Sequence, residues 1–207
     1  MRESSGVHTH SQTILPMVQS LLVEAGISLS QCDAIAFGCG PGSFTGVRTA
    51  CGIVQGLAFG LNLPVVPVGT LQAMAHACHA ASGATDVLAV LDARMGEVYW
   101  AQYRYADGWQ TVLEPNLSTP SAVAPQGEAL ACGNGFQAYA AAFEQSGLAV
   151  HAWSGITPHA VSVAQLARTA FSRGLTVSAR DAQPLYLRNK VALTTAERKA
   201  KAEAAAA

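Results

Sequence analysis

The stretch 38–48, GCGPGSFTGVR, constrains the fold of this chain more than any other. It follows a short apolar segment, 34–37, and leads into an amphipathic pattern over about 43–59. A strand, a glycine-rich turn and a helix in this order leave free backbone N–H groups beside an open helix N-terminus, where anions bind readily. The candidate nucleotide-proximal loop therefore consists of Gly40, Gly42, Ser43 and Gly46.

Neither of two common phosphate-binding fingerprints fits this loop. A P-loop needs a Lys beside a Ser or Thr after its last glycine, whereas Gly46 is followed by Val47 and Arg48. The dinucleotide fingerprint G-x-G-x-x-G has one residue fewer before its last glycine than this loop has. Two interpretations stay open: a phosphate contact, or a structural turn in which glycine lets helix and strand pack closely.

The predicted helix 43–59 has two different faces. One is apolar and consists of Val47, Cys51, Val54 and Ala58. The other consists of small residues: Thr45, Thr49, Gly52, Gly56 and Gly60. Because each interior glycine costs about 0.5–1 kcal/mol relative to alanine, we expect another backbone to approach this face closely. That backbone belongs either to the chain's own sheet or to a partner protein.

Several motifs resemble the TsaB (YeaZ-like) family. They are GPGSFTGVR at 40–48, QGLA at 55–58, PVVPV at 64–68, LDARMGEVY at 91–99, GNG at 133–135 and PLYLR at 184–188. The likeness runs from about His10 to Val191. It implies an α/β fold of the actin/Hsp70-like (ASKHA) kind, with two lobes and no catalytic residues in this chain.

The resemblance also implies a function and partners. A TsaD-type subunit, which uses ATP and a metal, places threonylcarbamoyl on the adenosine beside the tRNA anticodon (adenosine 37), and a TsaE-type ATPase completes the assembly. We therefore expect a cytoplasmic, non-catalytic dimerisation or scaffold subunit that binds no cofactor alone, touches tRNA only indirectly, and could form a homodimer. The expected partner-binding residues are Ile14, Met17, Val18, Leu21, Thr45, Thr49, Gly52 and Gly56.

The rest of the chain is predicted to form two lobes and a tail. Lobe 1–82 has an amphipathic helix from about Ser11, whose hydrogen-bonded part should start at about Thr13 because of Pro16. Strands and helices then alternate, which indicates a mostly parallel sheet. Lobe 83–193 begins as an antiparallel meander, with a predicted turn at 94–96 and another at 107–108. The stretch 194–207 is rich in Ala, Lys and Glu without an apolar stripe, and we expect a disordered tail.

Two helices are predicted in the second lobe. One runs from about Phe136 to Gln145, directly after the GNG turn. The other has Thr157 as its N-cap and Pro158 in its first turn, and it ends near Phe171.

The family normally begins with a strand, an Asp-Thr-Ser loop and a β-hairpin. None of these precedes the first predicted helix. The resemblance therefore implies a first lobe truncated at its N-terminus by about three strands, together with the loop that touches nucleotide phosphates in related folds.

Composition argues against several classes of protein. A formal net charge of −1 provides no basic excess for tight, independent binding of tRNA. Five cysteines without a C-x-x-C pair argue against a disulfide framework or a zinc ribbon and suit a reducing cytosol. No apolar run reaches the ~18 residues of a membrane span, and no charged-then-apolar leader opens the chain. We therefore expect no membrane association.

Clusters of titratable residues are interpreted as structural. Asp92, Arg94 and Glu97 surround a predicted hairpin turn with no nucleophile nearby, which favours solvated charges or an ion pair over catalysis. Two histidine pairs lack a neighbouring carboxylate to complete a metal site. They are His8 with His10 and His76 with His79.

Two alternative functions stay open. One is a nucleotide-dependent enzyme of the same superfamily fold, such as a sugar-kinase-like ATPase, with 40–46 and 133–135 as phosphate loops. The other is a metallopeptidase, which needs a metal site that the sequence does not indicate.

Overall fold

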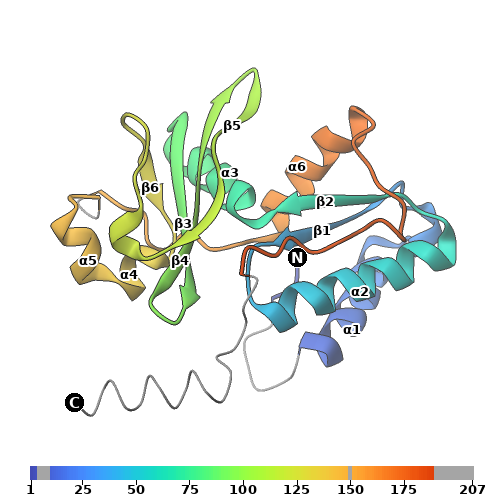
Figure 1. The fold of residues 1–207 in the computed structure, drawn as a ribbon. Coiled ribbons are helices and arrows are strands. Elements are labelled where there is room, and N and C mark those ends of the chain that lie inside the picture. The colour runs from blue at the N-terminus through green and yellow to red at the C-terminus, as the bar shows by residue number, and fades with distance from the viewer. Residues whose placement is uncertain (4–9, 149–150, 189–207) are drawn as a thin grey trace, which may run out of the picture.

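The computed structural model describes residues 1–3, 10–148 and 151–188 as a mixed α/β chain (Figure 1). Its helices and strands, in chain order, are α1 (His10–Ala25), β1 (Ile35–Gly40), α2 (Phe44–Leu61), β2 (Val65–Gly69), α3 (Thr70–Ser82), β3 (Asp86–Arg94), β4 (Glu97–Ala106), β5 (Gly108–Ser118), β6 (Leu130–Cys132), α4 (Gly135–Ala138), α5 (Ala140–Gln145) and α6 (Ala160–Ser172). Two short 3-10 turns lie at Leu29–Gln31 and Pro120–Ala122.

A small parallel sheet of β1 and β2 has helices on both faces. Phe37 and Val65 pack with α2 on one face, and the next residue of β2, Val66, packs with Ala167 of α6 on the other. This alternation follows from the two-residue period of a strand. The helix α1 lies beside α2, on the side away from the sheet (Figure 1).

The helix α2 buries the face that the sequence predicts. Its buried residues are Val47, Cys51, Val54 and Ala58, which confirms the predicted apolar side. Ser43 caps the helix by accepting a hydrogen bond from the Gly46 N–H at 3.4 Å, and Asn62 ends it in a left-handed conformation at φ 53°.

A second sheet has the strand order β5-β4-β3-β6. Its central strand β3 is buried on both faces: Val87 and Ala89 pack in the cluster that contains α3 residues, whereas Leu88 and Val90 pack with Phe136 of α4. The β3–β4 hairpin turns at 94–96 with positive φ angles, and a second turn at 107–108 leads into β5, so both predicted turns are confirmed.

Three predicted helix boundaries are wrong. The helix α1 begins at His10 and keeps Pro16 inside it; the unpaired carbonyl that this leaves is that of Gln12, an exposed residue that water can reach. The single helix predicted for 136–145 is broken at Tyr139 into α4 and α5. The helix α6 begins at Ala160, because His159 acts as the N-cap and accepts a hydrogen bond from the Val161 N–H.

The division of the chain into 1–82 and 83–193 stays a prediction. The helix α6 belongs by sequence to the second range but packs against the first sheet, with Ala167 in a cluster with Val66 and Val68 of β2. The predicted tail 194–207 and His8 lie outside the described residues. Among the helices of the described part, none is long and apolar enough to cross a membrane.

Candidate functional site

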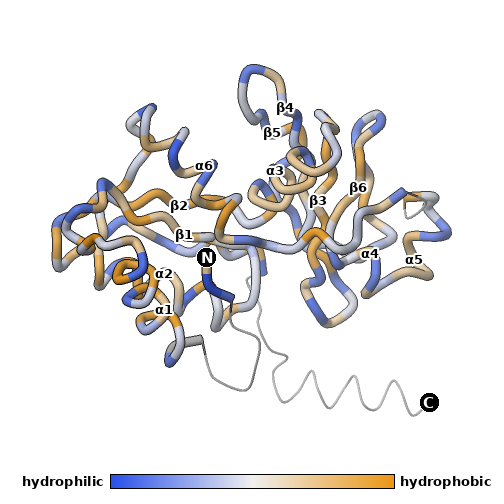
Figure 2. Tube along the Cα trace, turned by 180° about the vertical axis from the view of Figure 1, so that it is seen from behind, coloured by the Kyte–Doolittle hydropathy of each residue, from blue (hydrophilic) through white to orange (hydrophobic). Residues whose placement is uncertain are grey.

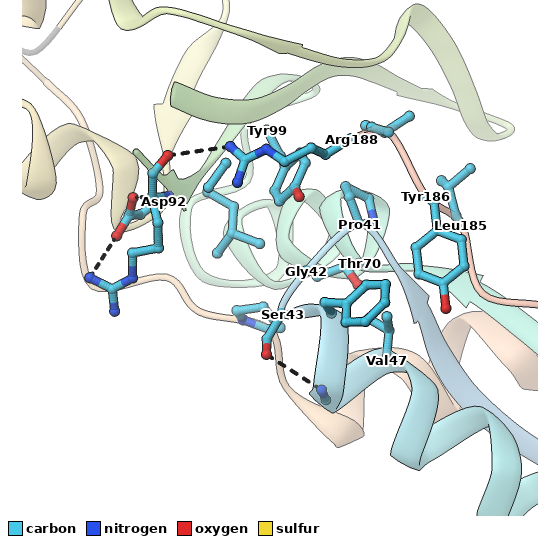
Figure 3. Close-up of a pocket in the computed structure, with 17 residues that line it drawn as sticks. Pro41, Gly42, Ser43, Val47, Thr70, Asp92, Tyr99, Leu185, Tyr186 and Arg188 are labelled. Carbon is cyan, nitrogen blue, oxygen red and sulfur yellow. Dashed lines mark hydrogen bonds and ion pairs between the residues drawn. The ribbon is translucent and has the colours of Figure 1, made fainter. Parts of the chain in front are cut away.

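A cleft of about 620 Å³ opens between the two sheets (Figure 3). Three segments that are far apart in sequence line it: the loop 41–47 before and at the start of α2, residues 91–94 at the end of β3, and residues 185–188 near the end of the described chain. The glycine-rich loop and the hairpin, two motifs noted in the sequence, therefore face a common space.

Gly40 shows why the loop needs glycine. Its φ is +114°, and a Cβ atom there would lie 2.7 Å from the carbonyl oxygen of Leu185. The Leu185 N–H donates a hydrogen bond of 2.7 Å to the carbonyl of Cys39, so the two backbones run side by side. Gly40 therefore packs against the Leu185 backbone, while Gly42, Ser43 and Gly46 line the cleft itself.

Residues 182–188, called the closing segment here, tie this region to α2. The carbonyl of Ala182 accepts hydrogen bonds from Gln55 Nε2 at 2.8 Å and from the Cys51 thiol at 3.3 Å. Further along, Tyr186 Oη accepts a hydrogen bond of 2.6 Å from Arg48 Nε. The Arg48 guanidinium also lies 3.8 Å from the centroid of the Phe44 ring, a cation–π contact that fixes its position.

The closing segment reaches the hairpin through Arg188. Its Nη2 atom lies 2.5 Å from Glu97 Oε2 and 3.3 Å from the carbonyl of Arg94. The Arg188 side chain is only 15% exposed, so this is a partly desolvated pair, which holds its geometry better than an exposed one.

Asp92 supplies the one carboxylate among the described residues that line the cleft, and its side chain is 7% exposed. Its Oδ1 atom accepts hydrogen bonds from the Arg94 N–H at 2.7 Å and from the Tyr139 hydroxyl at 3.1 Å, and its Oδ2 atom pairs with Arg94 Nη1 at 3.1 Å. Burial and the hydrogen bond to Asp92 raise the pKa of the Tyr139 phenol. The structure therefore contains an ion pair at this turn, one of the two structural arrangements that the sequence predicts.

The second glycine turn has a packing role. A Cβ atom on Gly133, whose φ is +112°, would lie 2.1 Å from the carbonyl oxygen of Val90, and one on Gly135 would lie 2.6 Å from a Val90 methyl carbon. Between them, Asn134 Oδ1 accepts a hydrogen bond of 3.0 Å from the Asp92 N–H. This turn does not line the cleft that the first loop faces, so the two loops do not share one site.

The chemistry available in the cleft is limited. Among the described residues that line it there is no Lys and no Cys, and the Asp92 carboxylate is already held by hydrogen bonds and an arginine. Within the described residues, no group of three His, Cys, Asp or Glu side chains could hold a metal ion. Nucleotide contact at the loop stays a prediction.

The residues predicted to bind a partner lie on the paired helices α1 and α2. Gly52 and Gly56 are exposed, and a Cβ atom on either would meet no heavy atom of the described residues within 4 Å. Thr45 is exposed and Thr49 half-buried. The four apolar residues of α1, all half-buried, are Ile14, Met17, Val18 and Leu21. The chain's own sheet therefore does not cover the glycine face. Of the two alternatives left open by the sequence, packing of this face on the chain's own sheet is excluded.

Large apolar side chains are exposed on the same two helices. Phe59 is 82% exposed, Val23 76% and Leu15 47%. Figure 2 shows hydrophobic residues along both helices. Exposed apolar surface next to open glycines is typical of a protein–protein contact.

Arg188 lines the cleft and Tyr139 holds the Asp92 carboxylate, but the sequence did not single them out as site residues. Each contacts a hairpin residue 47 or 91 positions away. The one available signal for Arg188 was its place in the PLYLR motif.

The chain is similar to proteins of tRNA modification. A family model described as TsaD, tRNA N6-adenosine threonylcarbamoyltransferase, matches residues 4–205. The tRNA threonylcarbamoyladenosine biosynthesis protein TsaB of Escherichia coli K12 is 43% identical over 190 residues, which cover 88% of this chain and 82% of that protein. The TsaB protein of Haemophilus influenzae is 39% identical over 195 residues, covering 88% and 81%.

Solved structures agree with this likeness. The structure of YeaZ from Pseudomonas aeruginosa is 40% identical in sequence, with a TM-score of 0.79 over 88% of this chain and 87% of that one. These comparisons confirm the predicted α/β, actin/Hsp70-like fold.

Proposed function

Because the chain belongs to the TsaB (YeaZ-like) family of tRNA threonylcarbamoyladenosine biosynthesis proteins, we propose that it is a cytoplasmic, non-catalytic subunit that binds and supports a TsaD-type catalytic subunit. In this proposal the partner holds ATP and the metal, a TsaE-type ATPase joins the assembly, and tRNA meets this chain only indirectly. The observation that carries the proposal is the open glycine face of α2.

The glycine face suits a helix of another chain. Gly52 and Gly56 lie one turn apart on α2, and small residues at this spacing let two helix axes approach closely. The neighbouring Phe59 and Val23 provide apolar surface that water would otherwise surround. A four-helix contact of α1 and α2 with two helices of the partner would bury both features.

The cleft supports a non-catalytic role. Catalysis needs a nucleophile, a base or a charged group that is free to act on a substrate. At the described cleft, Asp92 pairs with Arg94 and accepts a hydrogen bond from Tyr139, and Glu97 pairs with Arg188. The cleft is therefore built mainly from contacts that hold the two sheets together.

A direct binding experiment tests the proposal. The full chain is titrated with the TsaD-type protein of the same genome by calorimetry, and the assembly is sized by light scattering. We expect a complex that Gly56→Leu weakens by 100-fold or more, about 3 kcal/mol of overpacking at the contact, while the melting temperature of the isolated chain changes little.

Ala80→Leu on α3, also an exposed helix position, is the matched control and leaves the affinity unchanged. Absence of a complex with the wild-type chain, or equal affinity of Gly56→Leu and wild type, would show that this face does not bind the TsaD-type partner. A complex of two copies of this chain that Gly56→Leu dissociates would assign the face to a homodimer instead. Threonylcarbamoyl transfer or ATP hydrolysis by the chain alone would contradict the non-catalytic role.

A further inference from the structure

A second cleft, of about 690 Å³, lies on another side of the molecule. It is bounded by α3, by the turn between β4 and β5, and by the C-terminal end of α6. Figure 1 shows the β4–β5 hairpin and α6 rising on the same side of the molecule, with α3 between them. Its volume is within the range of about 300–1,000 Å³ that is common for small-molecule sites.

One wall of this cleft is aromatic and held in place. The Trp109 Nε1–H donates a hydrogen bond of 3.3 Å to His76 Nδ1. Since an indole nitrogen can only donate, His76 Nδ1 accepts, and the ring carries its proton on Nε2, which donates to Gln165 Oε1 at 3.0 Å. The Tyr105 ring lies 5.2 Å from that of Trp109, and the His79 ring meets Trp109 edge-on at 5.7 Å. The indole is therefore oriented before any ligand arrives.

Polar groups without partners surround the aromatic wall. Within the described part of the chain, the side chains of Arg173, Gln72 and Asp107 form no hydrogen bond or ion pair, although all three residues line the cleft. A Cβ atom on Gly108 would lie 3.6 Å from Arg173 Nη2, so the guanidinium sits beside the turn that precedes Trp109. An unpaired guanidinium next to an oriented indole is a combination that binds an anion attached to a ring.

We propose that this cleft binds a planar aromatic ring carrying an anionic group, the chemistry of a purine nucleoside monophosphate. The ring lies along Trp109, with Tyr105 beside it, and the Gln72 amide hydrogen-bonds to its edge. Arg173 pairs with the phosphate. This site is separate from the glycine loop and from the face of α2, so it does not depend on the proposed partner.

The test uses AMP with the full chain, followed by calorimetry and by tryptophan fluorescence. We expect AMP to bind, with adenosine and inorganic phosphate each at least roughly tenfold weaker, because each lacks one of the two recognised groups. Arg173→Gln should weaken the binding of AMP about tenfold or more and leave the affinity for adenosine unchanged. Asp107→Asn should strengthen the binding of AMP, because it removes a negative charge near the phosphate.

Arg168→Gln is the matched control, since Arg168 lies on α6, the helix that Arg173 caps at its C-terminal end, but lines a different cleft. It should leave AMP binding unchanged, and thermal melts verify that every variant folds. No binding of AMP at millimolar concentrations would overturn the proposal. So would AMP binding that Arg173→Gln and Gln72→Ala leave unchanged, or a loss in Arg168→Gln equal to that in Arg173→Gln.

Discussion

Arg188 Nη2 lies 2.5 Å from Glu97 Oε2 and so joins the closing segment to the hairpin of the second sheet. Arg188→Ala should lower the free energy of unfolding by about 1–2 kcal/mol, because a partly buried carboxylate loses a charged donor. Urea unfolding measures the loss, and hydrogen exchange should rise in the turn 94–97.

The control for this change is Arg104→Ala. Arg104 pairs with Asp86 at 2.8 Å, but its side chain is 51% exposed, and such pairs contribute about 0.5 kcal/mol or less. Equal losses in the two variants would show that the Arg188 pair has no special role in the cleft.

Gly133 is expected to tolerate no side chain. In Gly133→Ala the new methyl carbon would overlap the Val90 carbonyl, and the residue would keep a φ of +112°. We expect a loss of about 3 kcal/mol or more, or failure to fold. Gly155→Ala, where no heavy atom lies within 4 Å of the new carbon, should stay within about 0.5 kcal/mol of wild type. A mild effect of Gly133→Ala in urea unfolding would contradict the close packing of this turn on β3.

Gly52→Ala and Gly56→Ala should stabilise the isolated chain. Both positions are inside α2 and open, so alanine adds helix propensity without a clash, about 0.5–1 kcal/mol for each glycine replaced. Thermal melts of the isolated chain measure the gain. Destabilisation would mean that another part of this chain covers the face.

Tyr103 makes the stability depend on alkaline pH. Burial, together with the charge of Glu114, raises the pKa of this phenol above that of an unfolded tyrosine. Above pH ~10 the unfolded chain releases this proton while the folded chain keeps it, so the free energy of unfolding should fall as the pH rises further. Below that pH the contribution is fully present.

Urea unfolding of wild type and Tyr103→Phe between pH 8 and pH 11 (about one unit past the ordinary tyrosine pKa) checks this expectation. The variant should lose less stability over the interval than wild type does. Tyr105→Phe, at an exposed position, should show the same change in the free energy of unfolding with pH as wild type. A wild-type slope in Tyr103→Phe would rule out this residue as the cause.

The sequence predicted the elements that depend on local periodicity. The buried side of α2 could be read from Val47, Cys51 and Val54 because a helix places residues three and four apart on one face. Whether Gly52 and Gly56 were covered could not be read, since that depends on which segment packs nearby.

Helix starts were predicted less well, because several neighbouring residues can cap a helix. Thr157 and His159 both have a side chain that can accept from a backbone N–H, and the fold uses His159. The contacts of Asp92 with Tyr139 and of Glu97 with Arg188 were also out of reach, since sequence spacing carries no information on such distant pairs.

The closing segment also sets the time at which the protein can finish folding on the ribosome. Its Ala182 carbonyl accepts from Cys51, 131 residues earlier in the chain, so roughly 7–26 seconds of synthesis separate the two groups. The Gln55 amide precedes the same carbonyl by 127 residues, and Glu97 precedes its partner Arg188 by 91 residues. The cleft between the sheets is therefore among the last parts of the molecule to form, and the nascent chain exposes its edges until then.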